Sequence, residues 1–316
     1  MFRVIEGKND MRNVFSVWTF RGRRVLTAVL LCTLLCCFAN SKVHASDKVS
    51  VESVDFKSAI TGQRLPYTAF LPQGYAEANT RYPVLFLLHG LFGSHTNWLN
   101  LTNLADYVAN HKIIVITPEG HDGWYTDSAT VPADKYESYI MKELLPDVDS
   151  RFRTIGDRRA RGIAGLSMGG YGALKFGLKY PDKFVFAASI SGAFDAAARS
   201  DEHPGFSWDV LKPSVMAVFG PAGSRTRQEN DLHQLARNLS PANVATLPYI
   251  YLSCGTEDGF LDTNRDLDGV FLSKKIPHEF RELPGGHDWG FWDRQVREVL
   301  GLYSQLTKDE VNAGRK

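Results

Sequence analysis

The stretch "RGIAGLSMGGYGALKFG", from Arg161 to Gly177, joins a short apolar run to a helical pattern through one serine set among glycines. Gly165, Ser167 and Gly169 match the motif G-x-S-x-G. A sharp turn from strand to helix presses the positions two before and two after the serine against neighbouring backbone, which favours glycine at both. The same turn places the serine hydroxyl beside the free N–H groups of the helix N-terminus. The stretch therefore predicts an exposed nucleophile at Ser167.

Two other interpretations of this stretch are weaker. Ser167 could be an ordinary N-cap residue of a glycine-rich helix start, since five-residue motifs also occur by chance. A phosphate-binding loop is less consistent, because the chain shows neither G-x-G-x-x-G nor the lysine of a P-loop.

Apolar runs alternate with helical patterns along most of the chain, which predicts a mostly parallel, doubly wound α/β sheet preceded by antiparallel N-terminal strands. The predicted strands are residues 49–58, 65–71, 82–90, 112–120, 160–167, 183–192, 247–255 and 277–283. The predicted helices are residues 96–109, 133–148, 168–180, 262–274 and 289–306.

Residues 194–242 interrupt this alternation and show little clear periodicity. Long irregular connections inside a compact domain are usually functional or disordered. We expect an insertion here, above the strand ends, where a lid or a substrate wall belongs. A surface excursion without a role in the site is the alternative.

The first 45 residues resemble a secretory signal peptide, which leaves residues 46–316 as a single catalytic domain. An uncharged run of 15 residues, 25–39, is followed by the small-residue ending "VHA" at Ala45. The basic residues before the run are Arg3, Lys8, Arg12, Arg21, Arg23 and Arg24. This flank is long, so translation could begin at Met1 or at Met11. A retained anchor is the alternative, but membrane spans need about 20 apolar residues. We expect a secreted or periplasmic protein.

Removal of the leader leaves 29 Lys and Arg against 33 Asp and Glu, a net charge of −4. A mildly acidic chain without a basic stripe is a poor candidate for binding nucleic acid. Cys254 is then the single cysteine, so neither an internal disulfide nor a paired-cysteine metal site is expected.

A nucleophilic serine needs a base, and the base needs an orienting carboxylate. His287 lies in the tight loop "LPGGHDWG" between a late strand and the final helix, where strand ends converge in open α/β sheets. The carboxylate should lie between the two in sequence, just after a strand, in "YLSCGTEDGFLD". Asp258 is the preferred candidate, with Glu257 and Asp262 as alternatives.

An oxyanion hole requires two backbone N–H groups aimed at the developing negative charge. Met168, directly after the nucleophile, and Leu91, in the loop "LLHGLFGSHTNW", are the expected donors. We expect His89 to support this loop rather than to transfer protons. The candidate aromatic cleft walls are Trp98, Trp124 and Tyr125.

Four motifs, "LLHGLFGSHTNW", "GLSMGGYGAL", "CGTEDGF" and "PGGHDWGFW", together resemble the esterase-D-like family of the α/β-hydrolase superfamily. That family includes S-formylglutathione hydrolases, feruloyl and acetylxylan esterases and the antigen 85 mycolyltransferases. The resemblance spans about residues 49–302. It implies the α/β-hydrolase fold, a triad of Ser167, Asp258 and His287, and oxyanion donors at Leu91 and Met168.

The expected activity is a secreted serine carboxylesterase that acts on carbohydrate-linked acetyl or feruloyl esters, or on small aryl esters, without a metal or organic cofactor. A mycolyltransferase-type acyltransferase and an S-formylglutathione hydrolase-like thioesterase are the alternatives. The thioesterase fits less well, because the loop after residue 88 lacks the cysteine that those enzymes carry and their substrate is cytosolic. A binding protein on an inactive hydrolase fold is the weakest alternative. The expected partner is a small-molecule or carbohydrate ester, with no nucleic acid and no membrane after cleavage; the oligomeric state stays open.

Overall fold

The computed structural model describes residues 49–199 and 206–309, which contain one eight-stranded sheet. Its order is β1-β2-β4-β3-β5-β6-β7-β8. The pairs β1–β2 and β2–β4 are antiparallel, and every other pair is parallel. The strands are β1 Ser50–Val54, β2 Tyr67–Leu71, β3 Val84–Leu88, β4 Ile114–Pro118, β5 Arg161–Leu166, β6 Phe186–Ile190, β7 Tyr249–Gly255 and β8 Glu279–Leu283. This order confirms the predicted fold class.

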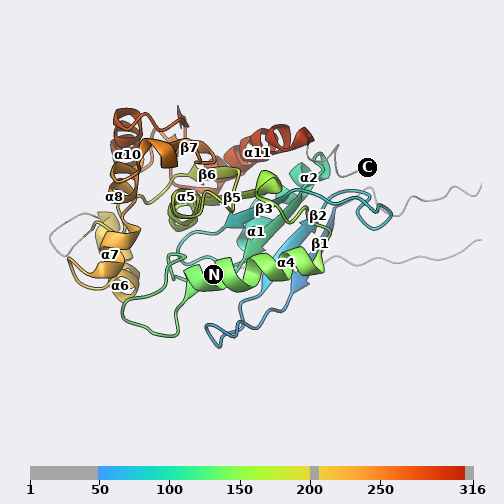
Figure 1. The fold of residues 1–316 in the computed structure, drawn as a ribbon, viewed down its shortest axis with the longest axis horizontal. Helices are drawn as coiled ribbons and strands as arrows, with labels where there is room; N and C mark the ends of the chain where they lie inside the picture. Colours follow the sequence, from blue (N-terminus) through green and yellow to red (C-terminus); the bar gives the residue numbers. More distant parts are fainter. Residues whose placement is uncertain (1–48, 200–205, 310–316) are drawn as a thin grey trace, which may run out of the picture. The chain divides into compact units, whose positions relative to one another are not determined.

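Helices cover both faces of the sheet (Figure 1). They are α1 Asn97–Leu101, α2 Leu104–Ala109, α3 Tyr136–Tyr139, α4 Leu145–Arg151, α5 Met168–Lys179, α6 Phe206–Phe219, α7 Arg225–Asn230, α8 Leu232–Arg237, α9 Pro241–Val244, α10 Leu261–Ser273 and α11 Trp289–Leu306. Apolar side chains of α1, α2 and α11 form one buried core, and those of α4, α5, α8 and α10 belong to the other. Continuous apolar strands such as β3 and β4 suit a sheet that is buried on both faces.

The sequence pattern predicted the strands well and the helix breaks less well. The last helix has the predicted bounds, 289–306, but the predicted helix 96–109 is two helices, α1 and α2. Thr102 separates them with an extended backbone, and its hydroxyl donates to the Trp98 carbonyl. The predicted helix 133–148 begins later and contains a π-helical segment, Ile140–Leu144, between α3 and α4. Apolar periodicity does not reveal such local changes of winding.

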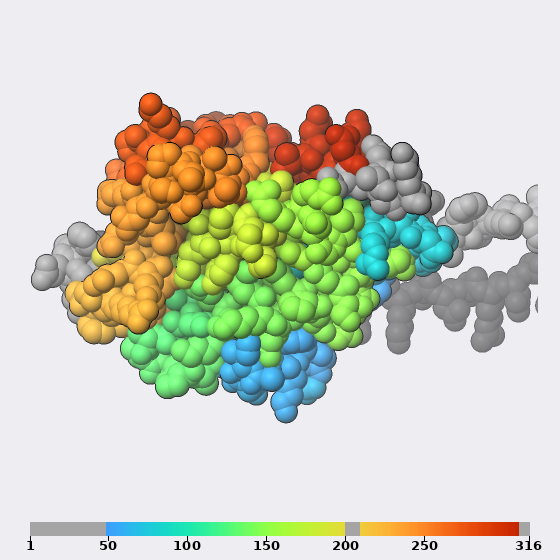
Figure 2. Space-filling model, viewed as in Figure 1, coloured from blue at the N-terminus to red at the C-terminus, as the bar shows by residue number. Residues whose placement is uncertain are grey.

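The insertion near 194–242 is more regular than its sequence suggested, because α6, α7, α8 and α9 occupy most of its described part. These helices connect β6 to β7 and, coloured yellow to orange, gather at one end of the face seen in Figure 2. The predicted signal peptide, residues 1–45, lies outside the described residues. Within the described residues, none of the helices is both long and apolar enough to span a membrane.

Candidate active site

Ser167 occupies the turn between β5 and α5 in a strained backbone conformation, with φ +52° and ψ −116°. A side chain on Gly165 would meet the Gly169 carbonyl oxygen at 2.4 Å, and one on Gly169 would meet the Leu88 carbonyl oxygen at 2.5 Å. Both motif glycines are therefore required by close backbone approach. The Ser167 N–H donates to the Ile190 carbonyl at 2.9 Å, which ties the turn to the end of β6.

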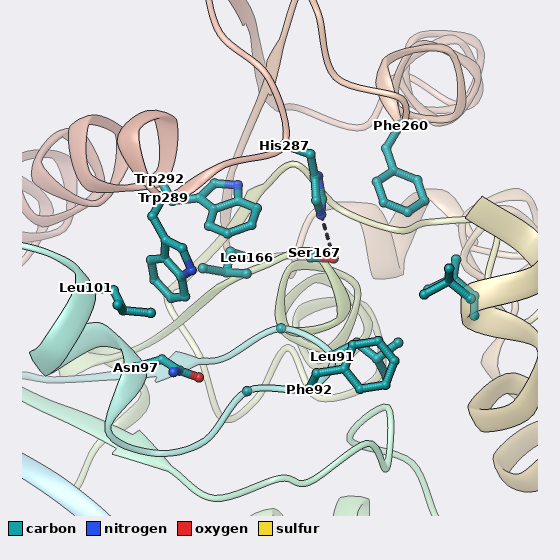
Figure 3. A pocket seen from close by; sticks show the side chains of 14 residues that line it. Leu91, Phe92, Asn97, Leu101, Leu166, Ser167, Phe260, His287, Trp289 and Trp292 are labelled. Atoms are coloured by element: carbon teal, nitrogen blue, oxygen red, sulfur yellow. Dashed lines mark hydrogen bonds between the residues drawn. The ribbon is translucent and has the colours of Figure 1, made fainter. Parts of the chain in front are cut away.

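His287 and Asp258 meet Ser167 at the C-terminal ends of the strands. The Nε2 atom of His287 lies 3.1 Å from the Ser167 hydroxyl oxygen (Figure 3), and its Nδ1 atom lies 2.9 Å from an Asp258 carboxylate oxygen. The imidazole comes from the loop between β8 and α11, and the carboxylate comes from the loop between β7 and α10. Three loops far apart in sequence thus form one hydrogen-bonded chain.

Charge and hydrogen bonding fix the proton positions in this chain. Burial acts to raise the pKa of Asp258, but the hydrogen bond and charge of His287, with the Phe260 N–H, outweigh it and lower that pKa. An ionised carboxylate only accepts hydrogen bonds, so Nδ1 of His287 carries the proton. Nε2 is then the lone-pair nitrogen and accepts the Ser167 hydroxyl proton, which is the arrangement of a general base beside a nucleophile.

The other acidic candidates serve the surrounding loops. Glu257 is exposed and accepts the Gly285 N–H at 2.6 Å, which holds the loop that carries His287. Asp262 is exposed at the start of α10, near Arg265. The structure therefore places Asp258, and neither alternative, against the imidazole.

For the backbone N–H groups of Leu91 and Met168, the structure shows no acceptor among residues 49–199 and 206–309. Met168 begins α5, and Leu91 lines the same pocket as Ser167. The Gly90 carbonyl accepts from His89 Nδ1 at 2.8 Å and from the Gly93 N–H at 3.1 Å. In a trans peptide the N–H points opposite to the carbonyl. These bonds therefore direct the Leu91 N–H away from His89 and Gly93. The assignment of Leu91 and Met168 as oxyanion donors stays a prediction.

An apolar pocket of about 460 Å³ surrounds the serine (Figure 3). Among the described residues that line it, His287 is the one with an ionisable side chain. The apolar lining side chains are Leu91, Phe92, Leu101, Leu166, Val210, Leu211, Phe260, Trp289 and Trp292. Phe260 and Trp292 both meet the His287 ring edge to face, with centroid distances of 5.0 and 4.9 Å. The pocket therefore excludes water from the imidazole on two sides and favours an uncharged group.

The expectation that Trp98, Trp124 and Tyr125 form the cleft walls is wrong. All three are fully buried, and none lines the pocket. Trp98 donates its indole N–H to the Leu88 carbonyl, and Trp124 donates to the Ser214 hydroxyl. The Tyr125 ring fills the space that Gly120 and Gly172 leave open. These aromatic rings pack in the interior against the loops and do not face the pocket.

The aromatic side chains that do line the pocket, which were not predicted from the sequence, are chiefly Trp289, Trp292, Phe260 and Phe92. A usable signal existed in "HDWGFW", where two tryptophans three residues apart directly follow His287 at a helix start. Residues at that spacing share one helix face. Val210 and Leu211 of α6 also line the pocket, so the inserted region supplies part of the pocket wall.

No group of three or more His, Cys, Asp or Glu side chains that could hold a metal ion occurs in the part of the chain that the structure describes. Cys254 is buried at the end of β7, and burial raises the pKa of its thiol.

Comparisons with known proteins identify the family. Residues 58–302 match the family model described as "Putative esterase". An acetyl esterase of Caldicellulosiruptor saccharolyticus is 27% identical over 271 residues, 82% of this chain and 100% of that protein. An S-formylglutathione hydrolase of Paracoccus denitrificans is 30% identical over 258 residues, 75% of this chain and 85% of that protein. An esterase of Mycobacterium tuberculosis is 30% identical over 73% of this chain, which spans only 54% of that longer relative.

A solved structure is similar in both fold and sequence. The substrate-bound FphF, a fluorophosphonate-binding serine hydrolase of Staphylococcus aureus, superposes with a TM-score of 0.70 at 28% identity, covering 81% of this chain and 98% of that chain. The chain therefore belongs to the esterase family and is an enzyme of the serine hydrolase class that acts on carboxylic esters.

Proposed function

We propose that the protein is an exported carboxylesterase that hydrolyses acyl esters through an acyl-enzyme intermediate on Ser167. The observation that carries the proposal is the continuous hydrogen-bonded chain from Ser167 through His287 to Asp258, set in an apolar pocket. A serine, an imidazole and a buried carboxylate in this geometry form a nucleophile with its general base.

In the proposed acylation step, His287 Nε2 removes the Ser167 proton while the hydroxyl oxygen attacks the ester carbonyl. The resulting oxyanion is stabilised by the N–H groups of Leu91 and Met168, at a helix N-terminus that favours negative charge. Asp258 stabilises the imidazolium that forms. The imidazolium then returns its proton to the departing alcohol, and the acyl group stays on Ser167.

In the deacylation step, His287 removes a proton from a water molecule, which attacks the acyl carbonyl. Collapse of the second oxyanion breaks the bond to Ser167 and returns the proton to its hydroxyl oxygen. The carboxylic acid leaves and the enzyme is regenerated. The groups of the protein that act in both steps are Ser167, His287, Asp258 and the N–H groups of Leu91 and Met168.

The pocket chemistry supports a neutral acyl or aryl group in the site. Trp289 and Leu101 lie together at one end of the pocket (Figure 3), and Phe92 and Val210 line both this pocket and a neighbouring one. Beyond Phe92 and Val210 lies a second hollow of about 390 Å³. Carboxylates of Asp122 and Asp134 line it, so it offers hydrogen-bond acceptors to hydroxyl groups. We therefore favour an ester of a small acyl or aromatic acid with a hydroxylated alcohol such as a sugar.

An S-formylglutathione hydrolase-like thioesterase is the second candidate, because a relative of that name is 30% identical over three quarters of the chain. Glutathione carries two carboxylates, which lysine or arginine side chains commonly bind. Among the described residues, no Lys or Arg lines the pocket or the second hollow. This lining favours the oxygen ester.

The test compares the mature protein, residues 46–316, with the Ser167→Ala variant. We expect the wild type to react with a fluorophosphonate probe and to hydrolyse p-nitrophenyl acetate, and the variant to do neither, with kcat lower by about 10⁴-fold. Acetyl, butyryl and feruloyl esters and S-formylglutathione then rank the substrates. Faster turnover of the thioester than of every ester would favour the second candidate, and normal hydrolysis by Ser167→Ala would exclude the proposed nucleophile.

Transfer and hydrolysis differ in the acceptor of the acyl group. Product analysis with and without an added sugar as acceptor distinguishes transfer from hydrolysis. We expect the free acid to be the main product whether or not the sugar is present. A dominant sugar ester would instead identify an acyltransferase.

Export is tested separately by expressing the full chain in a bacterial host and sequencing the N-terminus of the mature protein. We expect a new N-terminus close to Ala45, in the secreted or periplasmic fraction. An intact leader in the cytosolic fraction would contradict export without affecting the proposed reaction.

A further inference from the structure

Phe92 has a backbone conformation that bulky residues rarely adopt. Its φ is +59°, in the left-handed region. The residue stands third in a tight turn, residues 90–93, which is closed by a hydrogen bond from the Gly93 N–H to the Gly90 carbonyl at 3.1 Å. A turn position with positive φ favours glycine, because glycine has no Cβ atom to clash with the backbone. The turn alone therefore does not explain a phenylalanine at this position.

The Phe92 side chain is also strongly exposed. Its exposed fraction is 71%, which is more than that of any other large apolar side chain that the structure describes. A single exposed apolar residue needs no explanation by itself. Here, however, the exposed ring adds little hydrophobic stabilisation, while the positive φ costs stability. Because backbone strain of this kind is concentrated at functional sites, both features together point to a role in function.

A hydrogen bond fixes the backbone from which the ring projects. The Phe92 N–H donates to Oδ1 of Asp122 at 2.7 Å. Asp122 is half-buried and lies in the loop that follows β4. The residue before Phe92 is Leu91, whose N–H is the predicted oxyanion donor. The ring is therefore held one residue away from the group that is expected to bind the reacting carbonyl.

The Phe92 side chain lies at the boundary between two hollows. It lines the apolar pocket around Ser167 (Figure 3), and it also lines the second hollow, to which Asp122 and Asp134 contribute carboxylates. Val210 of α6 lines both hollows as well. A side chain that lines two hollows lies between them. A substrate that extends from the serine into the second hollow must therefore pass across the Phe92 ring.

The alcohol half of the ester is the part that suits this side. The carboxylates of the second hollow accept hydrogen bonds from hydroxyl groups. The pocket around Ser167 is apolar and suits the acyl group. A flat aromatic ring between the two offers a large apolar surface to a ring-shaped group that lies against it. The exposed Phe92 side chain is thus placed to become buried when an ester with such an alcohol binds.

We propose that Phe92 is a specificity-determining residue, whose ring is the surface on which the alcohol half of the ester packs. The class of substrate is an ester of a ring-shaped alcohol, such as a sugar or benzyl alcohol. The proposal rests on the proposed function, because it requires the acyl group to be bound at Ser167. The strained turn then holds the ring at the boundary between the hollows, although the fold gains little stability from it.

The test compares benzyl acetate with ethyl acetate, which have the same acyl group and leaving alcohols of similar acidity but different size. Phe92→Gly removes the ring and relieves the strained φ. We expect the ratio of kcat/KM for benzyl acetate to that for ethyl acetate to fall about tenfold, since part of one aromatic contact is lost. The ratio for p-nitrophenyl butyrate to p-nitrophenyl acetate, which differ only in the acyl group, should change less than twofold.

Two further variants separate the ring from its surroundings. Phe92→Tyr keeps the ring and should keep the benzyl-to-ethyl ratio within about twofold of the wild-type value. Leu272→Ala is the matched control, because it removes another exposed apolar side chain, 64% exposed, which lies on α10 outside the described lining of both hollows. Both ratios should equal those of the wild type in this control. Phe92→Ala carries the test if Phe92→Gly does not fold.

An unchanged benzyl-to-ethyl ratio in Phe92→Gly would overturn the proposal. A fall in the butyrate-to-acetate ratio, alone or to the same extent, would also overturn it, because the ring would then not act on the alcohol half. The serine mechanism has its own readout, the inactivity of Ser167→Ala. An inactive Ser167→Ala together with unchanged ratios in Phe92→Gly rejects only the role of Phe92, whereas an active Ser167→Ala rejects the mechanism itself.

Discussion

Gly120 donates its backbone N–H to Nε2 of His89 at 3.0 Å, while Nδ1 of the same imidazole contacts the Gly90 carbonyl at 2.8 Å. The same Nε2 lies 3.3 Å from a Glu119 carboxylate oxygen, which also accepts the Gly120 N–H at 3.1 Å. The ring is fully enclosed and does not line the pocket. His89 therefore links the loops that follow β3 and β4 at the C-terminal ends of these strands. It also holds the Gly90–Leu91 peptide, whose N–H is the proposed oxyanion donor.

His89→Ala should lower kcat by about 100-fold, the effect of losing one oxyanion donor, with a smaller change in KM. The physical reason is that the Gly90–Leu91 peptide loses the imidazole that orients it. Steady-state kinetics with p-nitrophenyl acetate measure this loss. His111→Ala is the matched control, because His111 lines a separate hollow beside Tyr107 and Arg297 that contains none of the proposed catalytic residues. Equal activity of the two variants would contradict the supporting role of His89.

Asp258→Asn should lower kcat by about 10³-fold to 10⁴-fold and leave the fold intact, because an amide no longer favours the His287 tautomer with its proton on Nδ1. Glu257→Gln is the control, since it alters the neighbouring carboxylate, which accepts the Gly285 N–H instead of contacting the imidazole. We expect that control to retain activity within a few-fold. The kcat values and circular dichroism spectra of both variants test whether Asp258 is the carboxylate that orients His287. A larger loss of kcat in Glu257→Gln than in Asp258→Asn would assign that role to Glu257 instead.

Gly169→Ala should destabilise the protein by about 1–3 kcal/mol and reduce its activity, because the new Cβ meets the carbonyl oxygens of Leu88 and His89 at 2.5 and 2.6 Å. Backbone on both sides must move apart, which displaces the oxyanion loop. Gly269→Ala in α10 is the control, since no atom lies within 4 Å of its added Cβ. Alanine favours a helix interior over glycine by about 0.5–1 kcal/mol, so this control should be more stable than the wild type. Urea denaturation measures both, and equal stability would show that the turn tolerates a side chain.

Lys175 and Glu137 form a buried ion pair with an N–O distance of 2.8 Å. Because of this pair, the free energy of unfolding should vary with pH in the acidic range. Burial acts to raise the pKa of Glu137, but the charges and hydrogen bonds of Lys175 and Lys179 lower it to about 2. Between its ordinary pKa of 4.5 and 2, the unfolded chain binds a proton that the folded chain does not. The free energy of unfolding should therefore fall as pH decreases through this range, and the contribution is complete above 4.5.

A neutral pair isolates this contribution. Glu137→Gln alone leaves Lys175 buried without its carboxylate and should cost about 3–5 kcal/mol. The double variant Glu137→Gln/Lys175→Met removes both charges and should recover much of that loss, with a shallower decrease in stability between pH 5 and pH 3. Urea unfolding at the two pH values measures the slopes. An unchanged slope in the double variant would show that other carboxylates cause the acid sensitivity.

Local sequence chemistry determined the serine turn, the strand pattern and the order of the three proposed catalytic side chains. Gly165 and Gly169 stand two positions before and two positions after Ser167, and both indicate close approach to neighbouring backbone. The apolar run of β3 indicates a strand covered on both faces. These features depend on steric limits and hydrophobic periodicity within a few residues, so they can be read without knowledge of the fold.

Only the tertiary structure decided which aromatic side chains face the substrate and which support the loops. Trp98 and Trp289 are both tryptophans that lie close to a motif residue in the sequence. Of the two, Trp289 lines the pocket and Trp98 is buried away from it. Side-chain direction depends on where α1 and α11 pack on the sheet, and no local pattern encodes that. The hydrogen bond from the Trp292 indole N–H to the Ser191 hydroxyl likewise joins two segments whose proximity exists only after the chain has folded.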